Sequence, residues 1–181
     1  MKAIPLDIPD IVPIKSKVFG EACALFFESY NQAQFEAAIG KFLQFVQDNY
    51  SRSVKNVLCS LYYQIQQLQG KLVRVVQGVV FNIAVDLRKS SKTFDQWVGE
   101  ILLDKNKRQL WVPEGFAQGF VILRDMAEFH YKTTDYYALA HECCILWNDA
   151  TLRIQWPAGI QAILSAKDAQ GKACTEAEVY A

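Results

Sequence analysis

The chain has 181 residues, of which 51% are hydrophobic, 13% aromatic and only 21% charged. This composition predicts a globular protein with a large core and excludes a disordered one, and the length predicts a single domain over residues 1–181. Nineteen basic residues balance nineteen acidic ones, so charge favours neither nucleic acid nor an anionic membrane as a partner. No apolar run reaches the 18 residues of a transmembrane helix.

The first predicted element is a short helix at Asn31–Ile39. Asn31 is a suitable N-cap, the apolar residues Phe35, Ala38 and Ile39 fall on one face, and Gly40 follows directly. We therefore expect the helix to end at Gly40 and the chain to return to a strand after it.

Strand patterns dominate the middle of the chain. Residues Leu72–Leu87 divide at Gln77–Gly78 into two alternating runs rich in Val and Ile, which predicts a hairpin. Further strands are predicted at Trp97–Leu103, Arg108–Val112 and Gly119–Leu123, each bounded by Gly, Pro, Asp or Asn. Many short strands at close spacing indicate an all-β sandwich or barrel.

The C-terminal part is predicted to be less regular. After Trp156–Pro157 we expect a short turn, then the segment Ile163–Gln170 with Ser165 as its N-cap, and finally a loose polar tail.

Cysteines indicate the compartment. Their number is odd, their spacing matches no disulfide framework, and the chain does not begin with the pattern of a secretory leader. The adjacent pair Cys143–Cys144 lacks the CxxC spacing of a metal or redox site. We therefore expect free thiols, a cytoplasmic location and no metal.

One stretch carries the most specific signal. Residues Gln47–Lys71, QDNYSRSVKNVLCSLYYQIQQLQGK, resemble the active-site core of the dTDP-4-dehydrorhamnose 3,5-epimerases, which reads roughly QDNHSxSxxxVLRGLHxQ. Other matching blocks follow the order of that family: VFGEACALFFESYNQ, QGKLVRVVQGVVFNIAVDLRKSSKTFDQWVG, NKRQLWVPEGFAQGF, AEFHYKTTDYY, ILWNDATLRIQWP and LSAKDA. Matches in one order over most of the chain are far more specific than a single motif.

The resemblance implies both a fold and an activity. The fold is an all-β, cupin-type jelly roll with an antiparallel double sheet and short helices, in a homodimer whose active sites borrow residues from the neighbouring subunit. The activity is that of an isomerase of deoxysugar and lipopolysaccharide O-antigen biosynthesis. Such an enzyme epimerises a nucleotide-linked 4-keto-6-deoxy sugar at two carbons or at one, without a cofactor.

The resemblance also assigns catalytic roles. A ketone acidifies the neighbouring C–H bonds, so the reaction needs a base, a proton donor on the opposite face and a group that stabilises the enolate oxygen. By resemblance, Tyr131 in EFHYKTT is the donor, Lys71 in QGK lies near the oxyanion, and Asp168 in SAKD holds the base. The family's base is a histidine, and Tyr62 occupies its position.

This replacement changes the expected chemistry. With a pKa near 10, a phenol is ionised in only about one molecule in a thousand at pH 7. Lys71 would lower the pKa of Tyr62 and Asp168 would raise it. A hydrogen bond from the Tyr62 hydroxyl to Asp168 would favour the neutral phenol.

Ligand-binding positions are partly retained. By resemblance, those that match nucleotide-contacting or neighbouring positions of the family are Glu28, Gln47, Asn49, Arg52, Lys71, Arg108 and Tyr137. Four pocket positions differ: Tyr50 and Gln118 replace histidines, and Cys23 and Cys59 replace arginines. Arginines make strong charge-assisted bonds to phosphate, so recognition of the base is better preserved than recognition of the diphosphate.

Each residue also has a plainer interpretation. In an unrelated β protein, Tyr131 and Tyr137 would belong to the core or its rim, Lys71 to the surface and Asp168 to a solvated helix. Only the resemblance over the whole chain places them in a cleft. His130 alternates with Tyr131 along a strand, so we expect it on the opposite face, as a packed or surface residue.

Three hypotheses remain from the sequence. In the first, the chain is an epimerase whose base is Tyr62 or a water, and its activity is therefore low or lost. Alternatively, it is a catalytically silent member that binds a sugar nucleotide or a partner enzyme. The third hypothesis is a structural cupin without a sugar nucleotide, which would leave the joint presence of Gln47, Asn49 and Glu28 unexplained.

Overall fold

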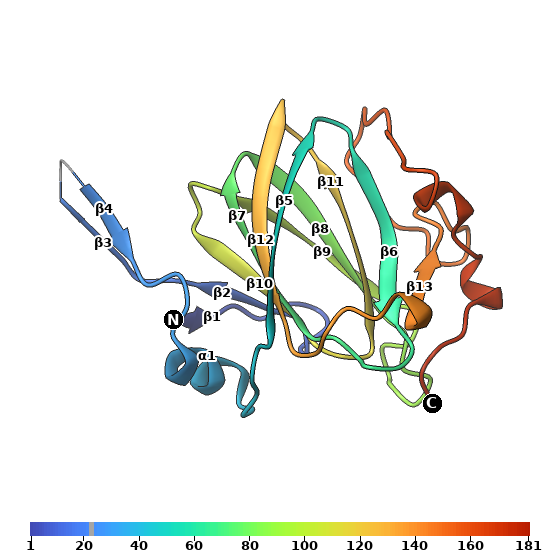
Figure 1. Cartoon of the computed structure of the whole chain (residues 1–181), viewed down its shortest axis with the longest axis horizontal. Helices are drawn as coiled ribbons and strands as arrows, with labels where there is room; N and C mark the ends of the chain where they lie inside the picture. Colours follow the sequence, from blue (N-terminus) through green and yellow to red (C-terminus); the bar gives the residue numbers. More distant parts are fainter. Residues whose placement is uncertain (22–23) are drawn as a thin grey trace.

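Two antiparallel β-sheets lie face to face in the computed structural model (Figure 1), which describes the backbone of residues 1–21 and 24–181 and the side chains of residues 1–19 and 26–181. The first sheet has the order β1 (Lys2–Ala3), β2 (Val12–Lys15), β10 (Arg108–Val112), β7 (Lys71–Gln77), β12 (Met126–Thr133), β5 (Gln47–Val54). The second has the order β13 (Glu142–Ile145), β6 (Leu58–Gln64), β11 (Phe116–Ile122), β8 (Val79–Asp86), β9 (Trp97–Leu103). The predicted antiparallel double sheet is confirmed.

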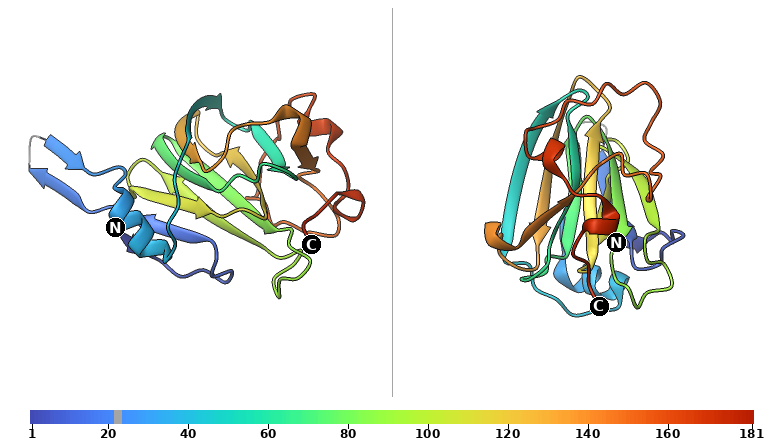
Figure 2. Two further views of the ribbon diagram at one scale, coloured as in Figure 1. Left: turned by 60° about the horizontal axis from the view of Figure 1, so that its bottom comes forward. Right: turned by 90° about the vertical axis from the view of Figure 1, so that its right-hand side faces the viewer.

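Alternating apolar side chains build the core between the sheets. Val73 and Val75 of β7 join Val80 and Ala84 of β8 in one buried cluster, to which β12 contributes Phe129. Successive side chains of a strand point to opposite faces, so one face of each strand can fill this core while the other faces outward. Figure 2 shows the two layers from the side.

The hairpin predicted at Gln77–Gly78 is wrong, although both strands exist. β7 belongs to the first sheet and β8 to the second, so the chain crosses between sheets at Gly78, which has a φ of 86°. A Cβ at this position would lie 2.2 Å from the carbonyl oxygen of Met126. An alternating pattern shows that a strand has one buried face, but it does not reveal which sheet the strand joins.

The predicted helix is confirmed as α1 (Gln32–Ile39). The side chain of Asn31 accepts a hydrogen bond from the backbone N–H of Gln34 at 3.1 Å, and Gly40 closes the helix with a φ of 68°. Phe35 is fully buried against Trp111, with ring centroids 5.4 Å apart. The chain does not return to a strand at once, because β5 begins only at Gln47.

The other predicted strands agree closely with the structure. β9 and β10 have the predicted bounds, whereas β11 begins three residues before the predicted Gly119 and ends at Ile122.

A two-stranded hairpin of β3 (Val18–Glu21) and β4 (Ala24–Phe27) projects from the body of the molecule (Figures 1 and 2). Two of its aromatic side chains, Phe19 and Phe26, are 47% and 67% exposed. Cys23, one of the predicted binding residues, lies outside the described residues.

The C-terminal tail is docked, contrary to the prediction that it is loose. It contains two 3₁₀ turns, η2 (Asp168–Gln170) and η3 (Cys174–Glu176), after an earlier one, η1 (Leu139–His141). The Tyr180 hydroxyl donates to the carbonyl oxygen of Gln64 at 2.7 Å, and Cys174 is buried. Apolar side chains spaced through the polar tail pack on the second sheet, which its mean polarity did not reveal. Ser165 Oγ accepts a hydrogen bond from the N–H of Asp168, as a cap would, but the N-cap position of η2 is Lys167 and not the predicted Ser165.

A buried carboxylate holds the end of β8. Asp86 is fully buried and accepts hydrogen bonds from Arg88, Ser91 and Thr93, while Arg88 also pairs with Asp10. Burial alone would raise the pKa of Asp86, but these hydrogen bonds outweigh it and lower the pKa to about 2. In the described part of the chain, no helix is long and apolar enough to cross a membrane.

Candidate active site

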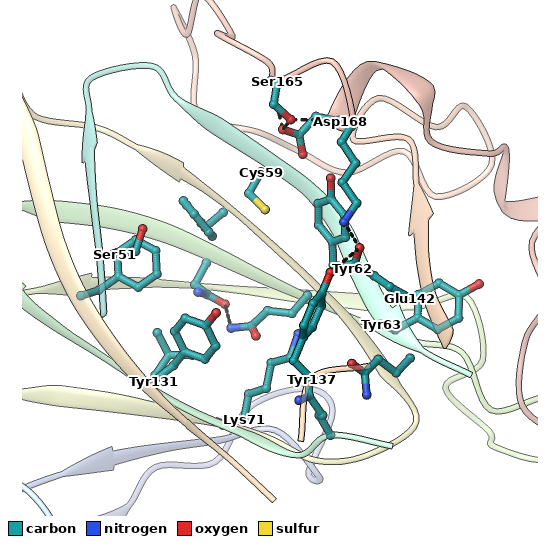
Figure 3. Close-up of a pocket in the computed structure, with 18 residues that line it drawn as sticks. Ser51, Cys59, Tyr62, Tyr63, Lys71, Tyr131, Tyr137, Glu142, Ser165 and Asp168 are labelled. Atoms are coloured by element: carbon teal, nitrogen blue, oxygen red, sulfur yellow. Dashed lines mark hydrogen bonds and ion pairs between the residues drawn. The ribbon is translucent and has the colours of Figure 1, made fainter. Parts of the chain in front are cut away.

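A cavity of about 360 Å³ opens between the two sheets at the end where the C-terminal segment crosses them (Figure 3). Side chains from β6, β7, β11 and β12 form its walls, and the segment that contains η2 covers part of it. The predicted site residues that line this cavity are Cys59, Tyr62, Lys71, Gln118, Tyr131, Tyr137 and Asp168. Residues more than 100 positions apart in the sequence are therefore brought to one place.

The wall formed by the first sheet contributes Lys71 and Tyr131. Their strands β7 and β12 are neighbours, with Tyr131 opposite Val73, so both side chains reach the same end of the cavity (Figure 3). Burial raises the pKa of Tyr131 from its usual 10, and Cys59 and Tyr137 raise it further. The Tyr131 hydroxyl therefore carries its proton at neutral pH and is able to donate it.

Lys71 is the cation of this wall. Burial lowers the pKa of its ammonium group, and the nearby thiol of Cys59 opposes this change. Among the described residues, no carboxylate forms an ion pair with Lys71. A partly buried cation without an anionic partner is suited to bind an anion or a developing oxyanion.

Tyr62 lies on β6 and lines the cavity on the wall formed by the second sheet. Burial raises the pKa of its hydroxyl far above the usual 10, and Cys144, Asp168 and Cys59 raise it further. The predicted effect of Asp168 is therefore present, whereas Lys71, expected to lower this pKa, acts on Cys59 instead. The phenol is neutral at neutral pH, so Tyr62 is a poor general base.

Asp168 is held by the backbone of β6 and by its own turn. One carboxylate oxygen accepts from the N–H of Ser60 at 2.8 Å, and the other accepts from the N–H and hydroxyl of Ser165. The Ser60 hydroxyl in turn donates to the carbonyl oxygen of Asp168 at 3.1 Å. These bonds fasten the C-terminal segment to the cavity wall and occupy several of the carboxylate's hydrogen-bond acceptor positions.

Cys59 adds no acid or base to this wall. Burial raises the pKa of its thiol to about 12, Asp168 raises it as well, and Lys71 opposes the change. Only the thiolate is a strong nucleophile, so Cys59 is unreactive at neutral pH.

Gln47 and Asn49 lie beside the mouth of the cavity. The Gln47 amide donates to the side-chain oxygen of Asn49 at 2.8 Å, and its own oxygen accepts from the N–H of Tyr137 at 3.1 Å. Both residues occupy the half-buried face of β5. Their amides are thus linked to Tyr137, which lines the cavity.

The remaining predicted residues lie elsewhere. Arg52 is on the outer face of β5 and pairs with Glu128 at 3.6 Å, and Arg108 pairs with Glu100 at the start of β10. Glu28 follows β4 and accepts from the side chains of Asn31 and Gln34, away from the cavity of its own chain.

The outer face of the first sheet also contains His130 of β12. His130 is exposed and packs edge-on against Tyr50, with ring centroids 5.1 Å apart. Its predicted position on the face opposite to Tyr131 is confirmed.

Among the lining residues that sequence reasoning missed, Lys167, Asn82 and Glu142 bear most on the chemistry of the cavity. Lys167 forms an ion pair with Glu142 and lies 5.3 Å from the centre of the Tyr62 ring. Asn82 is 1% exposed and accepts a hydrogen bond from Gln118. Two signals were available: Lys167 directly precedes Asp168, and Asn82 is a polar residue inside an apolar strand. No comparable signal marked Glu142.

Comparisons with known proteins agree with this geometry. Residues 5–176 match the family model described as dTDP-4-dehydrorhamnose 3,5-epimerase. A protein of that name from Pseudomonas aeruginosa is 56% identical and covers 99% of each chain, and one from Salmonella typhimurium is 55% identical over 93% of each.

Solved structures extend the likeness to the fold. A dTDP-6-deoxy-D-glucose-3,5-epimerase from Legionella pneumophila, in complex with dTDP-4-keto-L-rhamnose, has a TM-score of 0.95 and 47% identity, covering 98% of this chain and 94% of that one. A dTDP-4-dehydrorhamnose 3,5-epimerase from Bacillus anthracis, with TDP and PPi bound, has a TM-score of 0.90 and 40% identity, covering 95% and 98%. The resemblance seen in the sequence is confirmed.

Proposed function

Because the chain belongs to the dTDP-4-dehydrorhamnose 3,5-epimerase family, we propose that its cavity binds a dTDP-linked 4-keto-6-deoxy sugar and epimerises it slowly. The pathway would be deoxysugar biosynthesis, such as that of the lipopolysaccharide O-antigen. One observation carries the proposal: an unpaired lysine and a protonated tyrosine, Lys71 and Tyr131, converge in one cavity with Tyr62 and Asp168.

The two walls would then share the reaction unequally. With the sugar between them, the Lys71 ammonium stabilises the enolate oxygen and the Tyr131 hydroxyl delivers a proton. Removal of the first proton falls to the neutral Tyr62 or to a water beside it. Loss of a positioned general base typically costs about 100- to 10,000-fold in rate, so proton removal limits turnover.

A second candidate function is binding without catalysis. It is favoured by the raised pKa values of Tyr62 and Cys59 together with the hydrogen bonds that occupy Asp168. In this case the cavity holds the same sugar nucleotide, and the chain serves as a silent sugar-nucleotide-binding or partner-binding member of the family.

We also propose a cytoplasmic homodimer. The projecting hairpin of β3 and β4 exposes Phe19 and Phe26, and Glu28 at its base faces away from the cavity of its own chain. This arrangement suits a hairpin that reaches a neighbouring subunit. The cytoplasmic location is supported by the free thiols of Cys59, Cys143, Cys144 and Cys174.

Hydrogen exchange tests the proposal directly. The protein is incubated with dTDP-4-keto-6-deoxyglucose in deuterated water, and deuterium at C3 and C5 of the sugar is measured by mass spectrometry and NMR. We expect incorporation that is slow but faster than in buffer. Thermal stabilisation by dTDP without exchange would select the silent alternative. If no deuterium is exchanged and none of dTDP, CDP, GDP or UDP stabilises the protein, both functions are rejected.

A further inference from the structure

Two neutral amides form part of the cavity wall on the second sheet. Asn82 lies on β8 and Gln118 on the neighbouring strand β11, where Gln118 is paired with Tyr62 of β6 on its other side. A phenol and two amides therefore follow one another across three adjacent strands. All three residues line the cavity, and neither amide titrates.

This pair has more donors than it uses. Gln118 Nε2 donates to Asn82 Oδ1 at 3.0 Å, which satisfies the oxygen of Asn82. Asn82 Nδ2 has no hydrogen-bond partner among the described residues, although Asn82 is only 1% exposed. Nearly all buried polar groups in proteins are hydrogen-bonded, so an unpartnered donor inside a cavity wall points to a ligand that supplies the acceptor.

The surroundings of Asn82 restrict what that ligand group can be. Val73, Phe120 and Phe129 line the same cavity, with the two phenylalanine rings 4.7 Å apart. An apolar setting disfavours a charged group, whereas an amide N–H suits a hydroxyl or keto oxygen. The charged phosphates of a nucleotide are therefore less suited to this apolar wall than a neutral hexose is.

We infer that Asn82 is a specificity-determining residue that donates a hydrogen bond to a neutral oxygen of the ligand's sugar. The inference rests on the proposed function and adds which side chain of this wall selects the sugar. Because Nδ2 is covered in this structure, meeting the oxygen requires the Asn82 amide to turn about its last side-chain torsion, which has a broad minimum, and to release the hydrogen bond from Gln118. Asn82 takes no part in proton transfer.

The test separates the sugar from the nucleotide. Calorimetry measures the affinities of the full chain for dTDP and for dTDP-4-keto-6-deoxyglucose. Asn82→Asp keeps an oxygen for Gln118 but removes the donor, and Asn82→Ala removes both. In each variant we expect unchanged affinity for dTDP and about tenfold weaker binding of the sugar nucleotide, the size of one lost hydrogen bond. Asn106→Asp, the same change in the turn between β9 and β10, is the matched control and should alter neither affinity.

Two other results would overturn the inference. If both Asn82 variants keep the wild-type ratio of the two affinities, or lose dTDP and sugar nucleotide equally, Asn82 does not select the sugar and the inference is overturned. If the wild-type chain binds neither compound, the proposed function itself fails, and the inference fails with it.

A series of dTDP-sugars that each lack one hydroxyl or keto oxygen then identifies the atom. The analogue without the contacted oxygen should bind the wild type and Asn82→Ala equally. If every analogue still separates the two proteins, no sugar oxygen meets Asn82.

Discussion

The two walls of the cavity differ in what their side chains can do at neutral pH. On the first sheet, Lys71 is a cation with no anionic partner in the part of the chain that the structure describes, and Tyr131 is a phenol that carries its proton. On the second sheet, the thiol of Cys59 and the phenol of Tyr62 have raised pKa values, and Gln118 is a neutral amide. One wall thus suits an acid and oxyanion stabiliser, whereas the thiol, the phenol and the amide of the other are poor bases at neutral pH.

This difference teaches that a fold and a reaction are specified separately. The strands, their register and the cavity are set by buried apolar residues such as Val73 and Phe129, which do not depend on the wall's chemistry. The reaction depends on which group can accept a proton at a given place. Under the proposed function, replacing the base would leave the cavity intact and remove half of the catalytic pair.

The largest expected effect is a gain in rate when a base is placed on the wall formed by the second sheet. Tyr62→His places an imidazole, with a pKa near 6.5, beside the carboxylate of Asp168. We expect exchange of deuterium into the sugar to rise about 100- to 10,000-fold, the usual contribution of a general base. The measurement is the initial rate by NMR at pH 7.

The matched control adds a histidine outside the cavity. The expectation that Tyr50 is a pocket residue is wrong for the cavity of its own chain, because Tyr50 is 56% exposed on the outer face of β5 and does not line the cavity. Tyr50→His should therefore leave the rate unchanged. An unchanged rate in Tyr62→His, with dTDP still bound, would show that the second wall lacks more than a base.

A smaller effect, this time a loss of rate, is expected when the cation is removed from the wall formed by the first sheet. Lys71→Met deletes the charge but keeps the length of the side chain. Hydrogen bonds to charged groups contribute about 1.5 to 3 kcal/mol, so the exchange rate at low substrate should fall about 10- to 150-fold. Lys132→Met is the control, because Lys132 pairs with Asp48 on the outer face of the same sheet. Equal losses in both variants would contradict a specific role for Lys71.

The smallest effect on ligand binding should come from changing Asp86, whose carboxylate stabilises the fold and does not line the cavity. Each pKa unit corresponds to about 1.4 kcal/mol, so lowering the pKa of Asp86 from 3.8 to about 2 stabilises the native state by about 2 kcal/mol. We expect Asp86→Asn to lose about that much in urea denaturation at pH 7 and to bind dTDP as the wild type does.

The pH dependence of this contribution has a definite sign. The folded pKa lies below the unfolded one, so the stabilisation is complete above about pH 4 and disappears as the pH falls through about 2. The difference between wild type and Asp86→Asn should therefore shrink over this range. Asp125→Asn, at an exposed carboxylate, should show no such difference. A gap that persists at pH 2 would contradict the assignment.

Local rules predicted local structure well. The side chain of Asn31, the left-handed Gly40 and the spacing of Phe35 determine α1 within a few residues, so the helix could be predicted without knowledge of the rest. The alternation within β9 and β10 was equally sufficient. By contrast, the tail was expected to be loose, because the contact of Tyr180 with Gln64 joins residues 116 positions apart.

The site divides in the same way. The resemblance predicted the places of Tyr62, Lys71, Tyr131 and Asp168, which all line one cavity. It did not predict Glu142, Lys167 or Asn82, since their importance comes from contacts across strands rather than from a motif. The roles of all these residues remain predictions until the variants are measured.

By itself, the sequence determined the family and the β-rich fold, and it predicted that Tyr62 stands at the position of the family's histidine. These follow from residue types, alternation and the order of motifs, which are properties of the chain. Only the tertiary structure decided that Gly78 sends β7 and β8 into different sheets, that burial raises the pKa of Tyr62, and that Asn82 keeps a donor without a partner among the described residues. The physical reason is that sheet membership, desolvation and hydrogen bonding depend on neighbours that are distant in the chain and meet only when it folds.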